Sequence, residues 1–264
     1  MLRYCSLFCG STGNCTYVGT AEGGLLVDVG VSAKRIIRAL ESRDIDPASI
    51  RAVRVSHEHS DHVAGLRVLG KKYGWPVIAS EGTLDALTEE DKTAPNQPLY
   101  VVQPGQTVTA AGLRITAFST PHDSRSCLGF RVDSGDGRSL AVAPDMGYLP
   151  QSVLDALTGC QLIHIESNHD PEMLRTGPYP YYLQQRILGQ GGHLSNAVCA
   201  GALPGLVVAG ATRIALAHLS QHNNTPALAQ DTAVGALAAA DVAVGQDCLL
   251  WVTQPDSDQP VLYF

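Results

Sequence analysis

At 264 residues, 45% of them hydrophobic, the chain is long enough for one large domain with a buried core, and we expect a single domain over residues 1–264. The net charge of −7 argues against a protein that holds polyanions on a basic stripe, but it is compatible with a nuclease whose bound divalent ions neutralise a phosphate. No apolar run approaches the roughly 20 residues that span a bilayer, and the first ten residues are too short for a signal peptide, so we expect a cytoplasmic protein that does not enter the membrane.

The N-terminal part of the chain predicts strands followed by a helix. Residues 2–29 alternate short apolar runs with glycines, a pattern typical of a meander of strands at the edge of a sheet. Ser32 is expected to cap a helix that Asp46-Pro47 ends. A buried strand is predicted over residues 50–55 and a helix over residues 63–73, so the segment between them is a strand-to-helix loop.

Strands and helices alternate through the rest of the chain. Further strands are expected at 75–79, as a pair within 99–118, as a hairpin of 128–132 with 140–143, and at 162–165, 214–216 and 249–252. Further helices are expected at 83–87, 153–157, 183–188, 195–208 and 226–240, with a loop over 175–182. No linker, repeat or low-complexity segment interrupts this order, which indicates mixed sheets covered by helices.

The seven cysteines include no Cys-x-x-Cys pair. Their scatter argues against a disulfide framework and against a four-cysteine zinc site. We expect most of them to be small buried hydrophobic residues.

The loop between the strand at 50–55 and the helix at 63–73 concentrates metal-binding side chains. The segment 55–62 reads Val-Ser-His-Glu-His-Ser-Asp-His and holds three of the nine histidines. Imidazole and carboxylate ligands together suit zinc, manganese or iron. His57 and His59, two residues apart on an extended segment, point the same way and can share one ion, whereas Asp61 and His62 are better placed for a second. A solvated polar loop is the alternative, and the density of histidines argues against it.

Three more candidate ligands stand where predicted strands end. His122 follows the apolar run 113–118, Asp145 ends the run 140–144, and His218 ends the run 214–217. Strand ends are where α/β scaffolds collect site residues. An isolated aspartate at such a position is more often a turn former, but three candidates beside the histidine loop favour metal ligands.

This set of residues resembles the metal signature of the metallo-β-lactamase fold: His57-x-His59-x-Asp61-His62, then His122, Asp145 and His218. The resemblance implies an α/β protein (α+β in some schemes) built as a four-layer αββα sandwich, with a dinuclear site between its two sheets. It implies that His57, His59 and His122 hold one ion, that Asp61, His62 and His218 hold the other, and that Asp145 bridges them. The expected cofactor is two divalent ions per chain, zinc or manganese with iron as a further option, and the expected nucleophile is a hydroxide between them.

Further motifs are similar to the YycJ/WalJ-type branch of that superfamily, over about residues 4–234. They are Cys9-Gly10-Ser11-Thr12-Gly13-Asn14, Glu166-Ser167-Asn168-His169-Asp170, Gly177-Pro178-Tyr179-Pro180, Gly192-His193-Leu194-Ser195-Asn196 and the segment from His218 to Pro226. The branch comprises metal-dependent hydrolases, with 5′-to-3′ exonuclease activity on double-stranded DNA in some members. This chain departs from the branch at Cys9, where serine is expected, and at His222, and neither is a metal position.

Other polar residues are candidates for catalysis or for support of the ligands. By resemblance to the RNase Z-like branch, His193 donates a proton to the leaving oxygen, and Asp61 is expected also to hydrogen-bond the nucleophilic water. The alternative for His193 is a polar helix cap built with Ser195. Glu166, Asn168 and His169 are expected to orient ligands or contact substrate, or else to stabilise their loop.

The remaining candidates lie near the N-terminus. Asp28 is expected to hydrogen-bond loop backbone or a ligand imidazole rather than a metal. Ser11 and Asn14 belong to a glycine turn that either cradles a phosphate or closes a tight hairpin. His164, between two isoleucines, is expected to be a core histidine and His222 a loop residue.

We therefore predict a dinuclear phosphodiesterase, a 5′-to-3′ exonuclease with DNA as substrate. The alternative on the same site is hydrolysis of a small ester, thioester, lactone or cyclic phosphodiester. A redox or binding protein on this fold is disfavoured, because redox use of the fold replaces His59 by a carboxylate and adds a flavin domain.

Overall fold

The computed structural model describes residues 1–264, and its first sheet starts from the N-terminal meander. The antiparallel strands are β1 (Arg3–Phe8), β2 (Cys15–Thr20) and β3 (Gly23–Val27). Three parallel strands continue the sheet: β4 (Ile50–Arg54), β5 (Val77–Ala79) and β6 (Leu99–Val101). The C-terminal β14 (Leu262–Tyr263) pairs with β1 and forms the other edge of this seven-stranded sheet.

The second sheet also has seven strands and contains the later part of the chain. Its antiparallel half consists of β7 (Thr107–Ala110), β8 (Leu113–Ser119), β9 (Leu128–Ser134) and β10 (Ser139–Ala143). Its parallel half consists of β11 (Leu162–Glu166), β12 (Arg213–Ala217) and β13 (Leu249–Val252), added in that order to β10.

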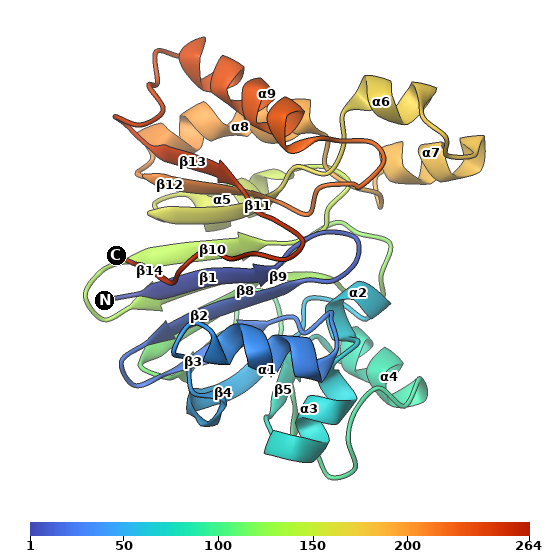
Figure 1. The fold of residues 1–264 in the computed structure, drawn as a ribbon, viewed down its shortest axis with the longest axis vertical. Coiled ribbons are helices and arrows are strands. Elements are labelled where there is room, and N and C mark those ends of the chain that lie inside the picture. The colour runs from blue at the N-terminus through green and yellow to red at the C-terminus, as the bar shows by residue number, and fades with distance from the viewer.

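Helices cover the outer face of each sheet (Figure 1). On the first sheet these are α1 (Ala33–Glu41), α3 (Leu66–Tyr73) and α4 (Glu81–Glu89), with the 3₁₀ turn η1 (Pro47–Ser49) and the short α2 (Ser60–Val63) in the connections. On the second sheet they are α5 (Gln151–Leu157), α8 (Asn196–Val208) and α9 (Pro226–Ala238). In Figure 1, α6 (Pro171–Thr176) and α7 (Tyr181–Leu188) extend past the right-hand end of the sheets.

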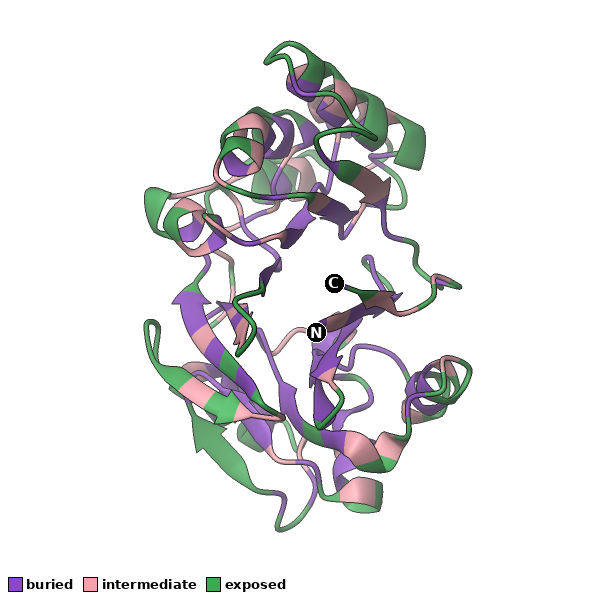
Figure 2. Ribbon diagram, turned by 90° about the vertical axis from the view of Figure 1, so that its left-hand side faces the viewer, coloured by how far each residue is buried: buried purple, intermediate pink, exposed green.

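Three buried apolar layers hold this arrangement together, and buried residues lie mainly on the strands and the inward sides of the helices (Figure 2). One layer packs α1, α3 and α4 on the first sheet, the second lies between the sheets, and the third packs α5, α8 and α9 on the second sheet. The predicted αββα order of layers is therefore confirmed. All seven cysteines are buried, as predicted for most of them. None of the helices combines the length and the apolar character that crossing a bilayer requires.

Three local predictions were wrong. Residues 99–118 contain parts of three strands rather than two, because the chain leaves the first sheet after β6 and enters the second at β7. The helix predicted over 63–73 is two helices, α2 and α3, because Gly65 donates its N–H to the Val29 carbonyl at 2.8 Å and pins the chain there. The loop predicted over 175–182 overlaps two helices: Asp170 caps α6 by accepting from the N–H groups of Glu172 and Met173, and α7 begins at Tyr181.

Candidate metal centre

Sheet topology brings the candidate ligands to one place. Strands β8 and β10 both run antiparallel to β9, and β11 and β12 run parallel to β10. The C-terminal ends of these four strands therefore lie on the same side of the sheet. The polar residues at or just after these ends are His122, Asp145, Glu166 and His218. In the first sheet β3 and β4 are parallel, and Asp28 and His57 follow their ends. The strand ends of the two sheets thus bring together residues that are up to 190 positions apart in the sequence, from Asp28 to His218.

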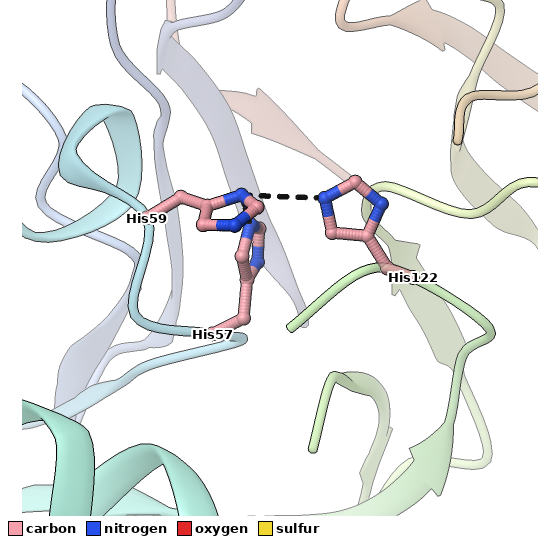
Figure 3. A group of neighbouring side chains, drawn as sticks. All are labelled: His57, His59 and His122. Carbon is pink, nitrogen blue, oxygen red and sulfur yellow. Dashed lines mark hydrogen bonds between the residues drawn. The ribbon is translucent and has the colours of Figure 1, made fainter. Parts of the chain in front are cut away.

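The first group of candidate ligands consists of three histidines whose rings converge (Figure 3). His57 Nε2 lies 3.1 Å from His59 Nδ1, and His122 Nε2 lies 3.3 Å from the same atom. Nitrogens bound to one tetrahedral zinc at about 2.05 Å stand roughly 3.3 Å apart, so the spacing fits a single ion. His122 donates its Nδ1–H to the Gly192 carbonyl at 2.9 Å, which leaves the lone pair of Nε2 facing the other two rings.

The second group consists of Asp61, His62 and His218. Asp61 Oδ2 lies 3.5 Å from Nε2 of His62 and 3.5 Å from Nε2 of His218. The Nε2 atom of His218 is buried and has no hydrogen-bond partner within the protein. A buried imidazole nitrogen without a partner, aimed at a carboxylate oxygen, fits a metal ligand.

Asp145 lies between the two groups. Its Oδ2 is 3.9 Å from His57 Nε2, 3.7 Å from His122 Nε2 and 3.6 Å from His62 Nε2. One carboxylate oxygen therefore faces ring nitrogens of both groups. The donor set fits two divalent ions that share this carboxylate.

Asp28 orients the candidate ligand His62 through a hydrogen bond. Its Oδ2 accepts hydrogen bonds from His62 Nδ1 at 2.8 Å and Ser56 Oγ at 2.8 Å, and its Oδ1 accepts from the Ser56 N–H at 2.7 Å. Because His62 donates through Nδ1, its Nε2 is left to bind an ion. Asp28 adopts a left-handed backbone with φ of 61° and His218 one with φ of 53°, so a ligand candidate of the second group and the residue that orients His62 both have an uncommon backbone conformation.

Glu166 joins His193 to the second group. Its buried Oε1 accepts from Nδ1 of His193 at 2.7 Å and from Nδ1 of His218 at 3.0 Å. Its Oε2 accepts the backbone N–H groups of Met146 and Leu194 at 2.8 and 3.0 Å. Both oxygens are thus fully occupied, so Glu166 orients two imidazoles and is not available to an ion.

The electrostatics of the site differ between its two groups. Burial lowers the pKa of His57 well below its ordinary value and also lowers the pKa of His122, which keeps both rings in the neutral form that binds metals. Burial also opposes charge on His62, but Asp28 and Asp145 outweigh it and raise the pKa of His62 well above its ordinary value. Burial likewise opposes charge on His218, but Asp145 outweighs it and raises the pKa of His218 well above its ordinary value. A metal ion bound by the second group would therefore have to displace protons from these two rings.

A polar hollow opens over the two groups. It has a volume of about 340 Å³ and no hydrophobic residue in its lining. The lining residues are Ser11, His59, Ser60, Asp61, Asp145, Arg186, His193 and His218. Such walls suit a charged group and offer no surface to an acyl chain.

The remaining candidates surround the ligands. Asn14 Nδ2 lies 3.1 Å from His62 Nε2, and Asn168 donates its Nδ2–H to the His218 carbonyl at 2.9 Å. His169 is buried, neither of its ring nitrogens has a partner, and burial lowers its pKa to about 4. Ser195 caps α8, with its Oγ accepting from the Val198 N–H at 3.3 Å. His164 is buried and hydrogen-bonds Tyr4 through Nδ1 at 2.7 Å, whereas His222 lies exposed on a loop.

Several supporting residues escaped the sequence interpretation. Ser56 Oγ lies 3.0 Å from His57 Nδ1, and its position beside the histidine loop was a usable signal. The Cys9 thiol accepts the His218 N–H at 3.1 Å, which gives this residue a role at the site. Arg186 reaches the hollow from α7, and nothing in its sequence neighbourhood indicated this placement.

Comparison with known proteins places this site in a family context. The family described as β-lactamase superfamily domain matches residues 25–219. Exodeoxyribonuclease WalJ of Streptococcus pneumoniae serotype 2 is 36% identical over 262 residues, which are 98% of this chain and 97% of that protein. Exodeoxyribonuclease YycJ of Bacillus anthracis is 34% identical over 262 residues and 99% of both chains. The metallo-β-lactamase fold protein YhfI from Bacillus subtilis, 17% identical, superposes over 97% of both chains with a TM-score of 0.71, which confirms the predicted fold.

Proposed function

The chain belongs to the β-lactamase superfamily, within the family of the WalJ and YycJ exodeoxyribonucleases, and on this premise we propose that it is a dinuclear metal-dependent phosphodiesterase that degrades DNA in the 5′-to-3′ direction. The observation that carries the proposal is the position of Asp145 Oδ2, 3.6–3.9 Å from ring nitrogens of both ligand groups. One carboxylate there can hold two ions, zinc or manganese with iron as a further option. The proposed ligands are His57, His59, Asp61, His62, His122, Asp145 and His218.

DNA is the proposed substrate for two reasons. Both relatives are named exodeoxyribonucleases, and the identity extends over nearly the whole of each chain. The hollow over the ligands has no apolar lining, which suits a phosphodiester better than a lactone or an acyl thioester. A small cyclic phosphodiester would fit the same chemistry, and the experiment below separates it from DNA.

The seven proposed ligands would hold two divalent ions, and these ions would supply a water of lowered pKa and positive charge to neutralise the phosphate. Asp61 Oδ2, at the side of the hollow, accepts a hydrogen bond from the attacking water and orients it. His193, which also lines the hollow, donates a proton to the leaving oxygen from Nε2, because Glu166 holds its Nδ1 at 2.7 Å. Glu166 thus fixes the direction from which the proton arrives.

The test is degradation of a duplex by metal-loaded protein, with the label at either the 5′ or the 3′ end of one strand. With the 5′-labelled strand, the label should be released first as a short product. The 3′-labelled strand should shorten stepwise while it keeps its label. His59→Ala and Asp145→Asn should abolish cleavage, since each removes a ligand. His222→Ala, which removes an exposed histidine that does not line the hollow, should cleave at the wild-type rate.

Two results would contradict the proposal. Turnover retained in His59→Ala would reject the ligand assignment. Cleavage of a cyclic phosphodiester, without cleavage of any DNA by protein with two bound ions, would reject the exonuclease and support the small-substrate alternative. For His193, replacement by glutamine should slow a phosphodiester with a poor alkoxide leaving group by a hundredfold or more, but should spare one with a p-nitrophenolate leaving group.

A further inference from the structure

Two neighbouring tyrosines at the start of α7 expose most of their surface. Tyr181 and Tyr182 are each 74% exposed, although most aromatic side chains bury their rings. The helix itself is anchored by Leu183, Gln184 and Ile187, which face the protein. Exposure is therefore confined to the side of α7 that carries the tyrosines.

This exposed side of α7 continues into the metal hollow. Arg186 lies four residues after Tyr182, so the two side chains share one face of the helix and are separated by about one turn, roughly 5.4 Å. Arg186 lines the hollow together with Asp61 and Asp145, and its Nε lies 2.5 Å from Asp123 Oδ2. Asp123 in turn lies 3.3 Å from Nε2 of the candidate ligand His122. In Figure 1, α7 and α2, which carries Asp61 and His62, lie at the same end of the sheets.

The position of α7 is set by contacts to the site rather than left free. The Ile187 carbonyl accepts the N–H of His193 at 3.0 Å, and Gln184 donates to the Tyr179 carbonyl at 2.9 Å. The loop after α7 is tied to the residue next to His122 through Gly191, whose carbonyl accepts the Asp123 N–H at 2.9 Å. The helix that carries the two tyrosines, about one turn from Arg186, is therefore held at a defined place, which lowers the entropy cost of binding a partner there.

We propose that Tyr181 and Tyr182 form a stacking platform for unpaired bases at the end of the DNA strand whose scissile phosphate lies in the metal hollow. The proposal rests on the proposed function. Every base has a π-face, so an aromatic platform binds bases without regard to sequence, as an exonuclease that degrades DNA of any sequence requires. The chain carries a net charge of −7, so apart from the bound ions it offers little overall attraction to a polyanion, and stacking supplies affinity that charge does not. A base can stack on the platform only when it is unpaired, so frayed or single-stranded ends should be preferred.

The test measures binding in a double-mutant cycle, in which the tyrosine rings are removed from the protein, the terminal bases are removed from the DNA, or both. The oligonucleotides carry a 5′ single-stranded end of two nucleotides, either with bases or abasic, with phosphorothioate linkages that prevent cleavage. The proteins are the wild type, Tyr181→Ala/Tyr182→Ala, Tyr181→Phe/Tyr182→Phe and Tyr263→Ala, all loaded with metal. Tyr263 is the matched control, because it is 55% exposed and lies on β14 next to the chain termini, at the other end of the molecule in Figure 1.

Wild type, the phenylalanine variant and Tyr263→Ala should bind the intact end roughly tenfold or more tighter than the abasic end. The double alanine variant should lose that preference and bind both ends as the wild type binds the abasic one. An alanine variant that keeps the preference, or that weakens binding of both ends equally, overturns the platform.

Hydrolysis of methyl p-nitrophenyl phosphate, a phosphodiester without a base, separates the platform from the chemistry. The double alanine variant should hydrolyse it at the wild-type rate, and a lower rate would assign the tyrosines to the structure of the site instead. Failure of the wild type on both DNA and this ester rejects the proposed function and the platform with it. Wild-type activity on DNA, combined with alanine variants that bind as the wild type does, rejects the platform alone.

Discussion

Replacing Asp28 by asparagine should weaken one metal position without disturbing the fold. Asp28 is buried and accepts three hydrogen bonds, from His62 Nδ1 and from the Oγ and N–H of Ser56. Asparagine keeps the size of the side chain and tolerates the left-handed backbone, φ of 61°, at least as well. It replaces one accepting oxygen by an NH₂ group, which must face either the Ser56 N–H or the protonated Nδ1 of His62.

The expected loss of metal affinity follows from replacing this one hydrogen-bond acceptor. Removing the partner that orients a ligand imidazole typically lowers metal affinity about 10- to 100-fold, or roughly 1.4–2.7 kcal/mol. The loss should fall mainly on the ion held by Asp61, His62 and His218, since Asp28 contacts His62 directly but reaches His57 only through Ser56. Tight stoichiometry should therefore drop from two ions toward one per chain.

The assay is calorimetric titration of metal-free protein, with Asp44→Asn as the matched control. Asp44 is an exposed aspartate with φ of 54°, so the control repeats the same substitution in the same backbone conformation away from the hollow. Asp44→Asn should bind both ions as the wild type does. Wild-type affinity at both positions in Asp28→Asn, or equal losses in both variants, would refute the reasoning.

Two further predictions concern stability. Burial lowers the pKa of His164 to about 4 from an unfolded value of 6.5, so the unfolded chain alone takes up this proton between those values, and stability should fall by about 3 kcal/mol as pH drops from 6.5 to 4. Urea unfolding of metal-free protein across that range should show this slope reduced in His164→Phe, and an unchanged slope would contradict it. At Gly30 an added Cβ would lie 1.6 Å from the Asp61 carbonyl oxygen, so Gly30→Ala should lower the melting temperature. Gly201→Ala in α8, where the new Cβ would meet no atom within 4 Å apart from the backbone of its own helix, should stabilise by about 0.5–1 kcal/mol. Equal melting temperatures for the two glycine variants would show that the loop at Gly30 yields to the added methyl group.

The ligand-bearing loops were predictable because their signals are local. An apolar run ending in His57-x-His59-x-Asp61-His62 specifies a buried strand and a metal-binding loop from neighbouring residues alone. The same holds for His122, Asp145 and His218, each of which stands where a run of strand-forming residues stops. The alternation of strand-rich and helical segments indicated mixed sheets covered by helices, and the family resemblance implied their four-layer order.

The sequence-based predictions of the fold were wrong where contacts to residues distant in the sequence decide the local structure. The strand β6 stays in the first sheet and β7 enters the second, a choice made by pairing with β5 and β8 and not by the composition of residues 99–118. The strand β14 is only two residues long and exists because β1, at the other end of the chain, offers it an edge. Short segments take the conformation that their partners impose, so their own propensity carries little information.

The sequence by itself indicated the chemistry proposed for this protein: the kind of candidate ligands, the strand ends that carry them and the family to which they point. Only the tertiary structure decided that His57 and His122 present Nε2 while His59 presents Nδ1, and that Asp145 Oδ2 faces both groups. It also decided that Glu166 holds both His193 and His218, and that Arg186 lines the hollow. The physical reason is range: residue type and periodicity are set within a few neighbours, whereas the atom that a side chain presents depends on hydrogen bonds to residues far along the chain.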